Sequence, residues 1–526
     1  MSYWAPAPEK REQMVLFPER LDEAIARDHP VRLLDMILGQ MSWTKWEARY
    51  HGRLGQPPIH PRVLAGTLLY GLLTRIRSSR CLEEALQVRL DFRWLVEGRS
   101  IDHTTLSEFR RKHGAELRDL FVQVGLVARD LGFLSLTTLA FDGTRIRANN
   151  RRSGTRTLAR LREMQKELAA KFEELEAKIE AEDTREDEVF ISAEPCPSGK
   201  ELADLRRRQE EVAAALAELE RVEQAGETVP SRIPLTDPQS RMTPNKEGGF
   251  APNYTPLATV DVDSGLIVSA DVIAMTNEDK YLVAAIEEVQ EQFSLEKPSP
   301  EMLADGMMAT TANLAALEER GVELYSPIPI PELKANPAVR DDPTHPVPEQ
   351  EWDQLPMKKV SVKGKKGQQL DKAAFLYDEE RNCYWCPQGQ ALEYVHTTSE
   401  PRSNRRLIRD RYKANPQACA GCPLRERCLQ GNGKRRQISR EPQENLRQTH
   451  ARKMATPDAK QKYARRRHPG ERPFAVIKHH FGARRFLLRG LDRVRTEWDW
   501  LATAFNLQRL MNLIRAGPLP ATIVAQ

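Results

Sequence analysis

The 526-residue sequence lacks any apolar run that approaches the roughly 20 residues a membrane span requires. Its first residues, MSYWAPAPEKREQ, also lack the apolar h-region of a secretory signal peptide. There is no large excess of one charge either, since the net charge is only +5. We therefore expect a cytoplasmic protein with no membrane partner, and the overall charge by itself identifies no ligand.

Cysteine is scarce, and most of it is concentrated in one region. Five of the seven cysteines are Cys383, Cys386, Cys419, Cys422 and Cys428. Disulfides are rare in cytoplasmic proteins. Two CxxC pairs about thirty residues apart are instead typical of a structural zinc site, in which four of the five thiolates bind Zn²⁺. The alternatives are an iron–sulfur cluster and cysteines that bind no metal.

Three acidic residues, far apart in the sequence, each have a setting suited to a metal-binding carboxylate. Asp142 follows a mostly apolar run at 136–141, which predicts a strand, and Asp305 follows the shorter apolar run 302–304. Residues at the carboxyl ends of strands are favoured site positions in α/β sheets. Glu471 follows a turn predicted at 468–470 and opens a helical pattern.

Each of these acids also has an ordinary structural interpretation. An Asp-Gly pair is most often a turn, and a glutamate in the first turn of a helix usually complements the helix dipole. Asp261 and Asp263 lie at a β-hairpin turn predicted around 263–265. We rank Asp261 below Asp142 as a ligand and assign Asp263 to the turn. Taken singly, none of the acids identifies a catalytic site.

Positive charge is concentrated near Glu471. Residues 451–495 contain 14 Lys or Arg and three acidic residues. Lys478 follows Glu471 by two helical turns, so both side chains are predicted on one helix face, about 10 Å apart. Such a segment is typical of a surface that binds a polyanion, although a solvated charged face has the same composition.

Several segments resemble bacterial insertion-sequence transposases of the DDE type. The most specific is 463–491, because Tyr463, Arg467, Glu471 and Lys478 match the Tyr/Arg/Glu/Lys signature of that family. The other resembling segments are 141–150, 248–268 and 303–328, together with 52–87, which is similar to the helical N-terminal domain of these transposases.

The sequence departs from the family pattern at two places. Tyr463 stands one residue farther from its arginine than in the simplest form of the signature. Many relatives have an aromatic residue shortly after the second aspartate, where this chain has Met307 and Met308. These departures concern local packing or a DNA contact, and they leave the three acids in place.

The resemblance implies an α/β fold with an RNase H-like catalytic core. That core would be a mixed five-stranded sheet with helices, in the order β-β-β-α-β-α-β along the chain. Its catalytic carboxylates would be Asp142, Asp305 and Glu471, with Asp142 bridging two Mg²⁺ (or Mn²⁺) ions. One ion would activate the attacking water or DNA 3′-hydroxyl, and the other would stabilise the leaving oxygen.

The resemblance also implies double-stranded DNA as the partner, both as terminal inverted repeats of the element and as target DNA. Lys478 and Arg467 would hold phosphates near the scissile bond, with Tyr463 beside them. A homodimer would hold two element ends, and the cytoplasmic protein would be nucleoid-associated. Further backbone contacts would come from Arg472, Arg484, Arg485 and Arg489.

The chain is predicted to divide into four regions, and the catalytic core is predicted to be interrupted by two insertions. Helical periodicity and proline content mark the insertions. Within the first region, a capping box at Thr105 and Glu108 is predicted to open a helix. The regions are a helical DNA-binding or dimerisation domain (1–130), the catalytic domain (131–330 and 451–515), a helical coiled-coil hairpin (154–226), and a proline-rich linker with the cysteine-rich insertion (331–450).

The predicted function is that of an insertion-sequence DNA transposase, an enzyme with endonuclease and polynucleotidyl transferase activities. It would bind element ends and catalyse two-metal strand cleavage and strand transfer. One alternative is a catalytically silent DNA-binding relic or regulator. Another is a metal-dependent nuclease that does not join strands. The presence of all three carboxylates favours the active transposase.

Overall fold

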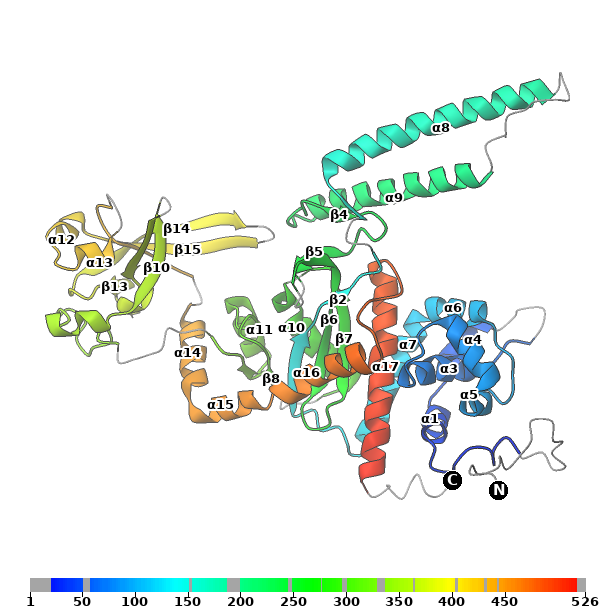
Figure 1. Ribbon diagram of the computed structural model, residues 1–526. Coiled ribbons are helices and arrows are strands. Elements are labelled where there is room, and N and C mark those ends of the chain that lie inside the picture. The colour runs from blue at the N-terminus through cyan, green and yellow to red at the C-terminus, as the bar shows by residue number, and fades with distance from the viewer. Residues whose placement is uncertain are drawn as a thin grey trace, which may run out of the picture.

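The computed structural model describes residues 20–50, 57–150, 154–186, 199–244, 248–275, 277–295, 300–328, 336–362, 365–402, 405–429, 433–441 and 444–517. Figure 1 shows a central mixed sheet flanked by a group of N-terminal helices, a long helical hairpin and a separate lobe of strands. Over those residues, no helix combines the length and apolar character that crossing a membrane requires.

The central sheet is built on the long strand β6 (Phe250–Asp261), which pairs along both of its edges. One edge pairs antiparallel with β1 (Thr138–Gly143), and the other pairs antiparallel with β7 (Ile267–Ile273). Beyond β1, the strands β8 (Glu301–Leu303) and β9 (Leu324–Tyr325) run parallel to it. The main strand order is therefore β7–β6–β1–β8–β9.

The helices α10 (Leu282–Gln292) and α11 (Thr311–Glu319) follow β7 and β8, so the main elements occur in the predicted order β-β-β-α-β-α-β. We expected five strands, but the sheet has seven strands within the described residues. The first half of β6 also pairs with the short strands β2 (Ile146–Arg147) and β5 (Arg241–Pro244).

Helix α17 (Leu491–Ala516) covers the sheet and joins it to the N-terminal helices α3 (Pro61–Leu73) and α7 (Gly114–Asp130) (Figure 1). The indole N–H of Trp498 donates to the Leu257 carbonyl oxygen of β6 at 3.1 Å. The side chain of Asn506 accepts the backbone N–H of Ile267 at 2.8 Å and donates to its carbonyl oxygen at 2.7 Å. Both side chains are buried, so these bonds set the position of α17 on β6 and β7.

Asp499 of α17 makes the stability of the protein depend on pH. Its carboxylate pairs with Arg118 of α7 at 3.1 Å, and Asp271 of β7 and Glu288 of α10 lie near. Burial raises the pKa of Asp499 to about 7, more than the Arg118 guanidinium lowers it. Because this folded-state pKa lies above the unfolded value, the contribution of Asp499 to stability is present at low pH and is lost as pH rises towards 7.

We therefore expect the Asp499→Asn variant to lose less stability between pH 5 and pH 8 than the wild type does. The difference in the free energy of unfolding should be about 2–3 kcal/mol, since about two pKa units separate pH 5 from the folded-state pKa and each corresponds to about 1.4 kcal/mol. Urea denaturation of both proteins at the two pH values measures it. Parallel pH dependences would show that Asp499 does not titrate in this range.

The N-terminal region is a group of packed helices. Helix α6 begins at His103, where the Asp102 Oδ1 accepts the backbone N–H of Thr105 at 2.8 Å. The predicted capping box at Thr105 and Glu108 is wrong, because Thr105 already lies in the first turn of the helix. The helical elements are α1 (Pro30–Gly39), α2 (Thr44–Glu47), η1 (Ala48–Tyr50), α3 (Pro61–Leu73), α4 (Ser79–Val88), α5 (Leu90–Leu95), α6 (His103–Lys112) and α7 (Gly114–Asp130).

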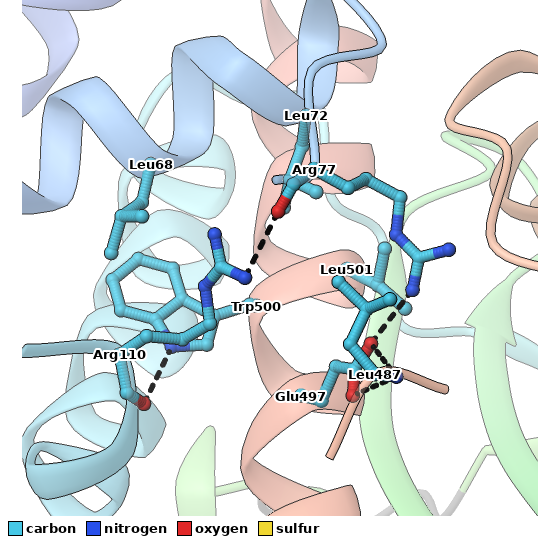
Figure 2. A pocket seen from close by; sticks show the side chains of 8 residues that line it. All are labelled: Leu68, Leu72, Arg77, Arg110, Leu487, Glu497, Trp500 and Leu501. Atoms are coloured by element: carbon cyan, nitrogen blue, oxygen red, sulfur yellow. Dashed lines mark hydrogen bonds and ion pairs between the residues drawn. The ribbon is translucent and has the colours of Figure 1, made fainter. Parts of the chain in front are cut away.

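A small pocket lies between the N-terminal helices and α17 (Figure 2). Glu497, one of the residues that line it, links α17 to two other segments of the chain. The buried carboxylate of Glu497, on α17, pairs with the Arg77 guanidinium at 2.7 Å. It also accepts the backbone N–H groups of Leu487, at 2.9 and 3.0 Å, and of Leu488, at 2.8 Å. Arg110 of α6 donates to the Arg77 carbonyl oxygen at 3.0 Å. Glu497 thus holds both partner segments against α17.

The predicted helical hairpin corresponds to α8 (Leu158–Glu186) and α9 (Gly199–Gln224), which extend away from the sheet in Figure 1. Leu161 and Leu168, near the start of α8, share a core with Val212 and Leu219, near the end of α9, so the two helices are antiparallel. Most of the segment 194–200, whose Pro and Gly residues indicate the loop between the two helices, lies outside the described residues. The short strands β3 (Thr155–Arg156) and β4 (Ile233–Pro234) pair at the base of the hairpin.

The lobe that follows β9 has a core of its own. Ala338, Val347 and Leu355 are buried in that core, so residues 336–356 pack into the lobe and do not form the extended linker predicted for this proline-rich segment. The predicted linker residues 331–335 lie outside the described residues. The elements of the lobe are η4 (Glu349–Gln354), β10 (Met357–Val362), β11 (Lys365–Leu370), η5 (Lys372–Ala374), β12 (Leu376–Asp378), β13 (Cys383–Trp385), β14 (Ala391–Arg402), β15 (Arg405–Ala414), α12 (Pro416–Ala420), α13 (Arg425–Cys428) and β16 (Gln437–Arg440).

Two helices lead from the lobe back to the sheet. Helix α14 (Glu444–Ala455) packs against α11, and the His450 ring donates to the Ser326 carbonyl oxygen at 2.7 Å. Helix α15 (Pro457–Ala464) packs beside β9. The domain boundary predicted at residue 450 therefore falls inside α14, which belongs with the sheet because its buried face packs there.

Candidate active site

The structure brings the three predicted acids together at one end of the sheet. The parallel register of β1 and β8 pairs Ala140 with Leu303, and two residues beyond this pair come Asp142 and Asp305. Glu471 lies on α16 (Arg467–Ala475), which packs against β1 and β6. The Asp142 carboxyl interacts electrostatically with both Asp305 and Glu471. Parallel strands end at the same edge of a sheet, so distant residues meet there.

Asp142 is half-buried at this end of the sheet. Burial raises the pKa of its carboxyl, and the charges of Asp305 and Glu471 raise it further. Two contacts oppose this rise in pKa. Asp142 forms an ion pair with Arg466 at 3.0 Å, and its Oδ1 accepts the backbone N–H of Gly143 at 2.9 Å. The net pKa shift is upward, so an additional positive charge near Asp142 would be strongly favourable.

Asp305 occupies a tight loop after β8. Its Oδ1 accepts the backbone N–H of Met307 at 2.8 Å, and its carbonyl oxygen accepts the hydroxyl of Ser326. Met307 is 68% exposed, whereas Met308 is buried at 3% exposure. Of the two methionines found where many relatives have an aromatic residue, Met307 therefore lies on the surface and Met308 lies in the core.

The helix that carries Glu471 begins earlier than predicted. Helix α16 starts at Arg467, so the turn expected at 468–470 is the first turn of the helix itself. Pro469 fits there, because the first N–H groups of a helix have no partner within the helix. Glu471 is exposed, and the preceding Gly470 packs close to the Asp142 carboxylate.

Lys478 does not lie on a continuous α-helix with Glu471. It lies in the π-helix η6 (Val476–His480), which follows α16 directly. Pro473 inside α16 lacks the N–H that would extend the α-helical ladder, and a change of helical pitch follows it. The Lys478 Nζ donates to the Thr144 hydroxyl, two residues after Asp142. Lys478 therefore lies beside the end of the strand that carries Asp142, but the continuous helix face that the spacing predicted is interrupted.

The remaining predicted DNA-binding residues have different surroundings. Tyr463 is half-buried and packs with Tyr325 against β1 and β8, so it supports the strands that carry the aspartates. Arg467 is exposed at the start of α16, and Arg472 is half-buried. Arg484, Arg485 and Arg489 are exposed. The Arg484 guanidinium contacts the His479 ring at 2.9 Å, and that of Arg489 donates to the Asn149 carbonyl oxygen at 2.9 Å. The backbone of Arg485 forms a β-bridge with Arg147 of β2.

Two further charged residues at this site carry no sequence signal that identifies them. Arg466 precedes α16 and pairs with Asp142. Glu278 begins η3 (Glu278–Tyr281), after β7, and its carboxylate packs so closely on Gly143 that a Cβ at that position would overlap it. Burial raises the pKa of Glu278 to about 7, and the charges of Asp142 and Asp305 contribute to the rise. In the sequence, Glu278 resembles an ordinary helix-start glutamate.

The predicted cysteine cluster lies in the separate lobe. Cys386, Cys419, Cys422 and Cys428 are half-buried against one core, whereas Cys383 is buried on β13. In the part of the chain that the structure describes, no three His, Cys, Asp or Glu side chains form a ready-made metal-binding group.

Two family models match this chain. A model described as a transposase DDE domain matches residues 385–511, a range that includes Cys386, Glu471 and Lys478. A model described as a transposase domain (DUF772) matches residues 19–112, within the N-terminal helices. Neither range includes Asp142 or Asp305. Among curated proteins, a search finds no match to the chain.

Proposed function

Both family matches are to transposases and support an insertion-sequence DDE transposase; on that premise we propose that this chain binds the ends of a DNA element and cuts and joins strands there. One observation carries the proposal. Asp142, Asp305 and Glu471, from three distant parts of the chain, interact at one end of the sheet, next to a strongly basic segment. The strand order β7–β6–β1–β8–β9, with β6 antiparallel, supports the RNase H-like core that a DDE domain implies.

The donor chemistry of this site fits a divalent cation. Carboxylate oxygens are the ligands that Mg²⁺ and Mn²⁺ prefer, and Asp142, Asp305 and Glu471 would supply them. Burial raises the pKa of Asp142, and the charges of Asp305 and Glu471 add to the rise, which supports a site where a bound cation would stabilise the ionised carboxylate. When bound there, Mg²⁺ (or Mn²⁺) would lower the pKa of an attacking water or 3′-hydroxyl and polarise the phosphate.

The basic side chains around the acids would bind and orient the DNA backbone. Lys478 is held by Thr144 next to Asp142, and Arg467 is exposed on the helix that carries Glu471. The Arg466 Nη2 pairs with Asp142 at 3.0 Å, so this arginine would offset part of the negative charge that the acids and a phosphate bring together. Two copies of the chain would act together, because both element ends must be cut.

A strand-cleavage assay tests the proposal. Purified protein is incubated with Mg²⁺ or Mn²⁺ and a duplex that ends in the terminal repeats flanking the gene. The expected products are strands nicked at the repeat end and strands joined to a second duplex. Nicking without joining would indicate a nuclease, and DNA binding without either product would indicate a silent DNA-binding protein.

We also propose that Glu278 is a fourth carboxylate of the metal site. The expected result is that Glu278→Gln weakens Mn²⁺ binding by the DNA-free protein about tenfold, a loss typical of residues that support metal ligands. Titration followed by electron paramagnetic resonance measures this affinity. The neighbouring Asp279→Asn is the matched control and should bind Mn²⁺ like the wild type.

Gly143→Ala tests the same contact from the other side. The three atoms nearest to the added methyl all belong to the end of the flexible Glu278 side chain, so the fold should be retained while the carboxylate is displaced. Mn²⁺ affinity should then fall as it does in Glu278→Gln. Unchanged affinity in both variants would remove Glu278 from the site.

A further inference from the structure

Four of the five clustered cysteines come together from two segments of the lobe. Cys386 lies in the turn after β13, and the other three lie on or beside the short helices α12 and α13. The Cys428 thiol interacts electrostatically with Cys386, Cys419 and Cys422, and the Cys386 thiol interacts with Cys419 and Cys422. All four pack against the same core.

The backbone around two of these cysteines donates hydrogen bonds to sulfur. The Cys386 Sγ accepts the backbone N–H of Gln390 at 3.3 Å, and the N–H of Gln388 also points to it. Gly389 makes this turn with φ of 69°. The Cys422 thiol accepts the backbone N–H of Leu424 in the same way. Burial raises the pKa of both thiols, more than these donors lower it. Around a bound metal, the same N–H groups would donate to the coordinating sulfur atoms and hold them in place.

Three arginines surround the cluster and donate to the backbone of its cysteines. Arg340 donates to the Cys386 carbonyl oxygen at 2.8 Å, Arg425 to that of Cys419 at 2.9 Å, and Arg436 to that of Cys428 at 2.8 Å. Arg436 is only 6% exposed. Four thiolates around one divalent ion leave an excess of negative charge, and these guanidinium groups would offset it.

Cys383 lies outside this group. It is a strand residue of β13, and its side chain alternates with that of Tyr384, which is buried in the core against which the other four cysteines pack. The charged neighbours of Cys383 are Asp378, Arg381 and Glu393, and no other cysteine is among them. Its CxxC spacing with Cys386 therefore does not indicate a shared metal.

We propose that Cys386, Cys419, Cys422 and Cys428 bind one structural Zn²⁺ ion and that Cys383 does not. A closed set of four thiolates is the ligand set of structural zinc sites. The ion would tie the turn after β13 to α12 and α13 across a small core, where a metal adds much of the stability that burial alone does not provide. This site lies in a lobe separate from the carboxylates, so it does not depend on the proposed catalysis (Figure 1).

Metal analysis of the full-length protein tests the assignment. Purification without chelator, followed by elemental analysis, should find about one zinc and no iron per chain in the wild type. Cys386→Ser and Cys428→Ser should each lose most of this zinc, while the matched Cys383→Ser should retain it. Full zinc in either of the first two variants, or loss of zinc in Cys383→Ser, would overturn the ligand set.

A second measurement keeps the proposal testable if the serine variants fail to fold. The zinc of the wild-type protein is removed with a chelator and replaced with Co²⁺. The visible spectrum of a tetrahedral tetrathiolate Co²⁺ site is expected, with one Co²⁺ per chain. A spectrum without thiolate-to-metal bands, or the absorption of an iron–sulfur cluster in the protein as purified, would contradict the proposal.

Discussion

The Asp142→Asn variant is expected to lose at least about a thousandfold of DNA-nicking activity while binding duplex DNA as tightly as the wild type. A catalytic metal contributes several kcal/mol to transition-state stabilisation, and each 1.36 kcal/mol is a factor of ten in rate. Asp142 interacts with both Asp305 and Glu471, so its replacement removes the charge at the centre of the set. Denaturing gels of nicked duplex measure the rate, and fluorescence anisotropy measures DNA binding.

The substitution should not reduce the stability of the protein. The folded-state pKa of Asp142 is raised, so ionisation of this carboxyl opposes folding at neutral pH, and asparagine removes that unfavourable charge. Asparagine also keeps an oxygen that can accept the N–H of Gly143. The thermal midpoint at pH 8 is therefore expected to match or exceed the wild-type value.

Asp263→Asn is the matched control for this experiment. Asp263 lies at the hairpin turn after β6, about half exposed, and pairs with Arg465 at 2.7 Å. Exposed ion pairs contribute about 0–1 kcal/mol, so this variant should nick DNA and unfold like the wild type. Equal activity of Asp142→Asn and wild type would show that the acids at this edge of the sheet are not catalytic.

The Glu497→Gln variant is expected to lose about 3 kcal/mol of stability. Removal of one partner of a buried ion pair leaves the other charge uncompensated, at a cost of roughly 3–5 kcal/mol. Glu497 is 6% exposed at its side chain, and Arg77 is 14% exposed. Glutamine would also place an amide group towards the N–H groups of Leu487 and Leu488, where the carboxylate now accepts. Urea denaturation followed by circular dichroism measures the loss.

Glu287→Gln is the matched control, because Glu287 also pairs with an arginine but lies on the surface. In that pair, Glu287 is 51% exposed and Arg320 is 34% exposed. Its loss should cost at most about 1 kcal/mol. If both variants lose the same small amount, then Glu497 does not hold the N-terminal helices to α17. If only Glu497→Gln is destabilised, that contact is an essential part of the fold.

Local patterns in the sequence were sufficient for the main strands and for two of the acids. Alternating apolar residues predicted the β6–β7 hairpin, and Asp263 lies in its turn as assigned. Asp261, which we ranked below Asp142 as a ligand, accepts the N–H groups of Leu136 and Ser264. Asp142 and Asp305 were found because each follows an apolar run that forms a strand. The helix boundaries at Thr105 and Glu471 were less accurate, because several polar residues nearby can begin a helix.

Glu278 and Arg466 could not have been found in this way. Each is one of many charged residues at a helix start, and neither has a distinctive spacing. Their place in the site depends on the return of β7 to β6 and on the packing of α16 against β1, which are contacts between distant segments. The same is true of the cysteines: the CxxC spacing joined Cys383 to Cys386, but Cys383 is buried on β13, whereas Cys386 lies in the turn that follows and neighbours Cys419 and Cys422.

The sequence by itself determined which residue types this protein has for its chemistry: three acids at or near element ends, a basic segment beside the last acid, and a cluster of cysteines. These features are local, because apolar periodicity and turn residues act over a few positions. Only the tertiary structure decided which groups meet. The parallel pairing of β1 with β8 aligned Asp142 with Asp305, and α16 brought Glu471 and Arg466 to them. The physical reason is that charge and burial act through space, so the pKa shifts and ion pairs of this site exist only once the distant segments have packed.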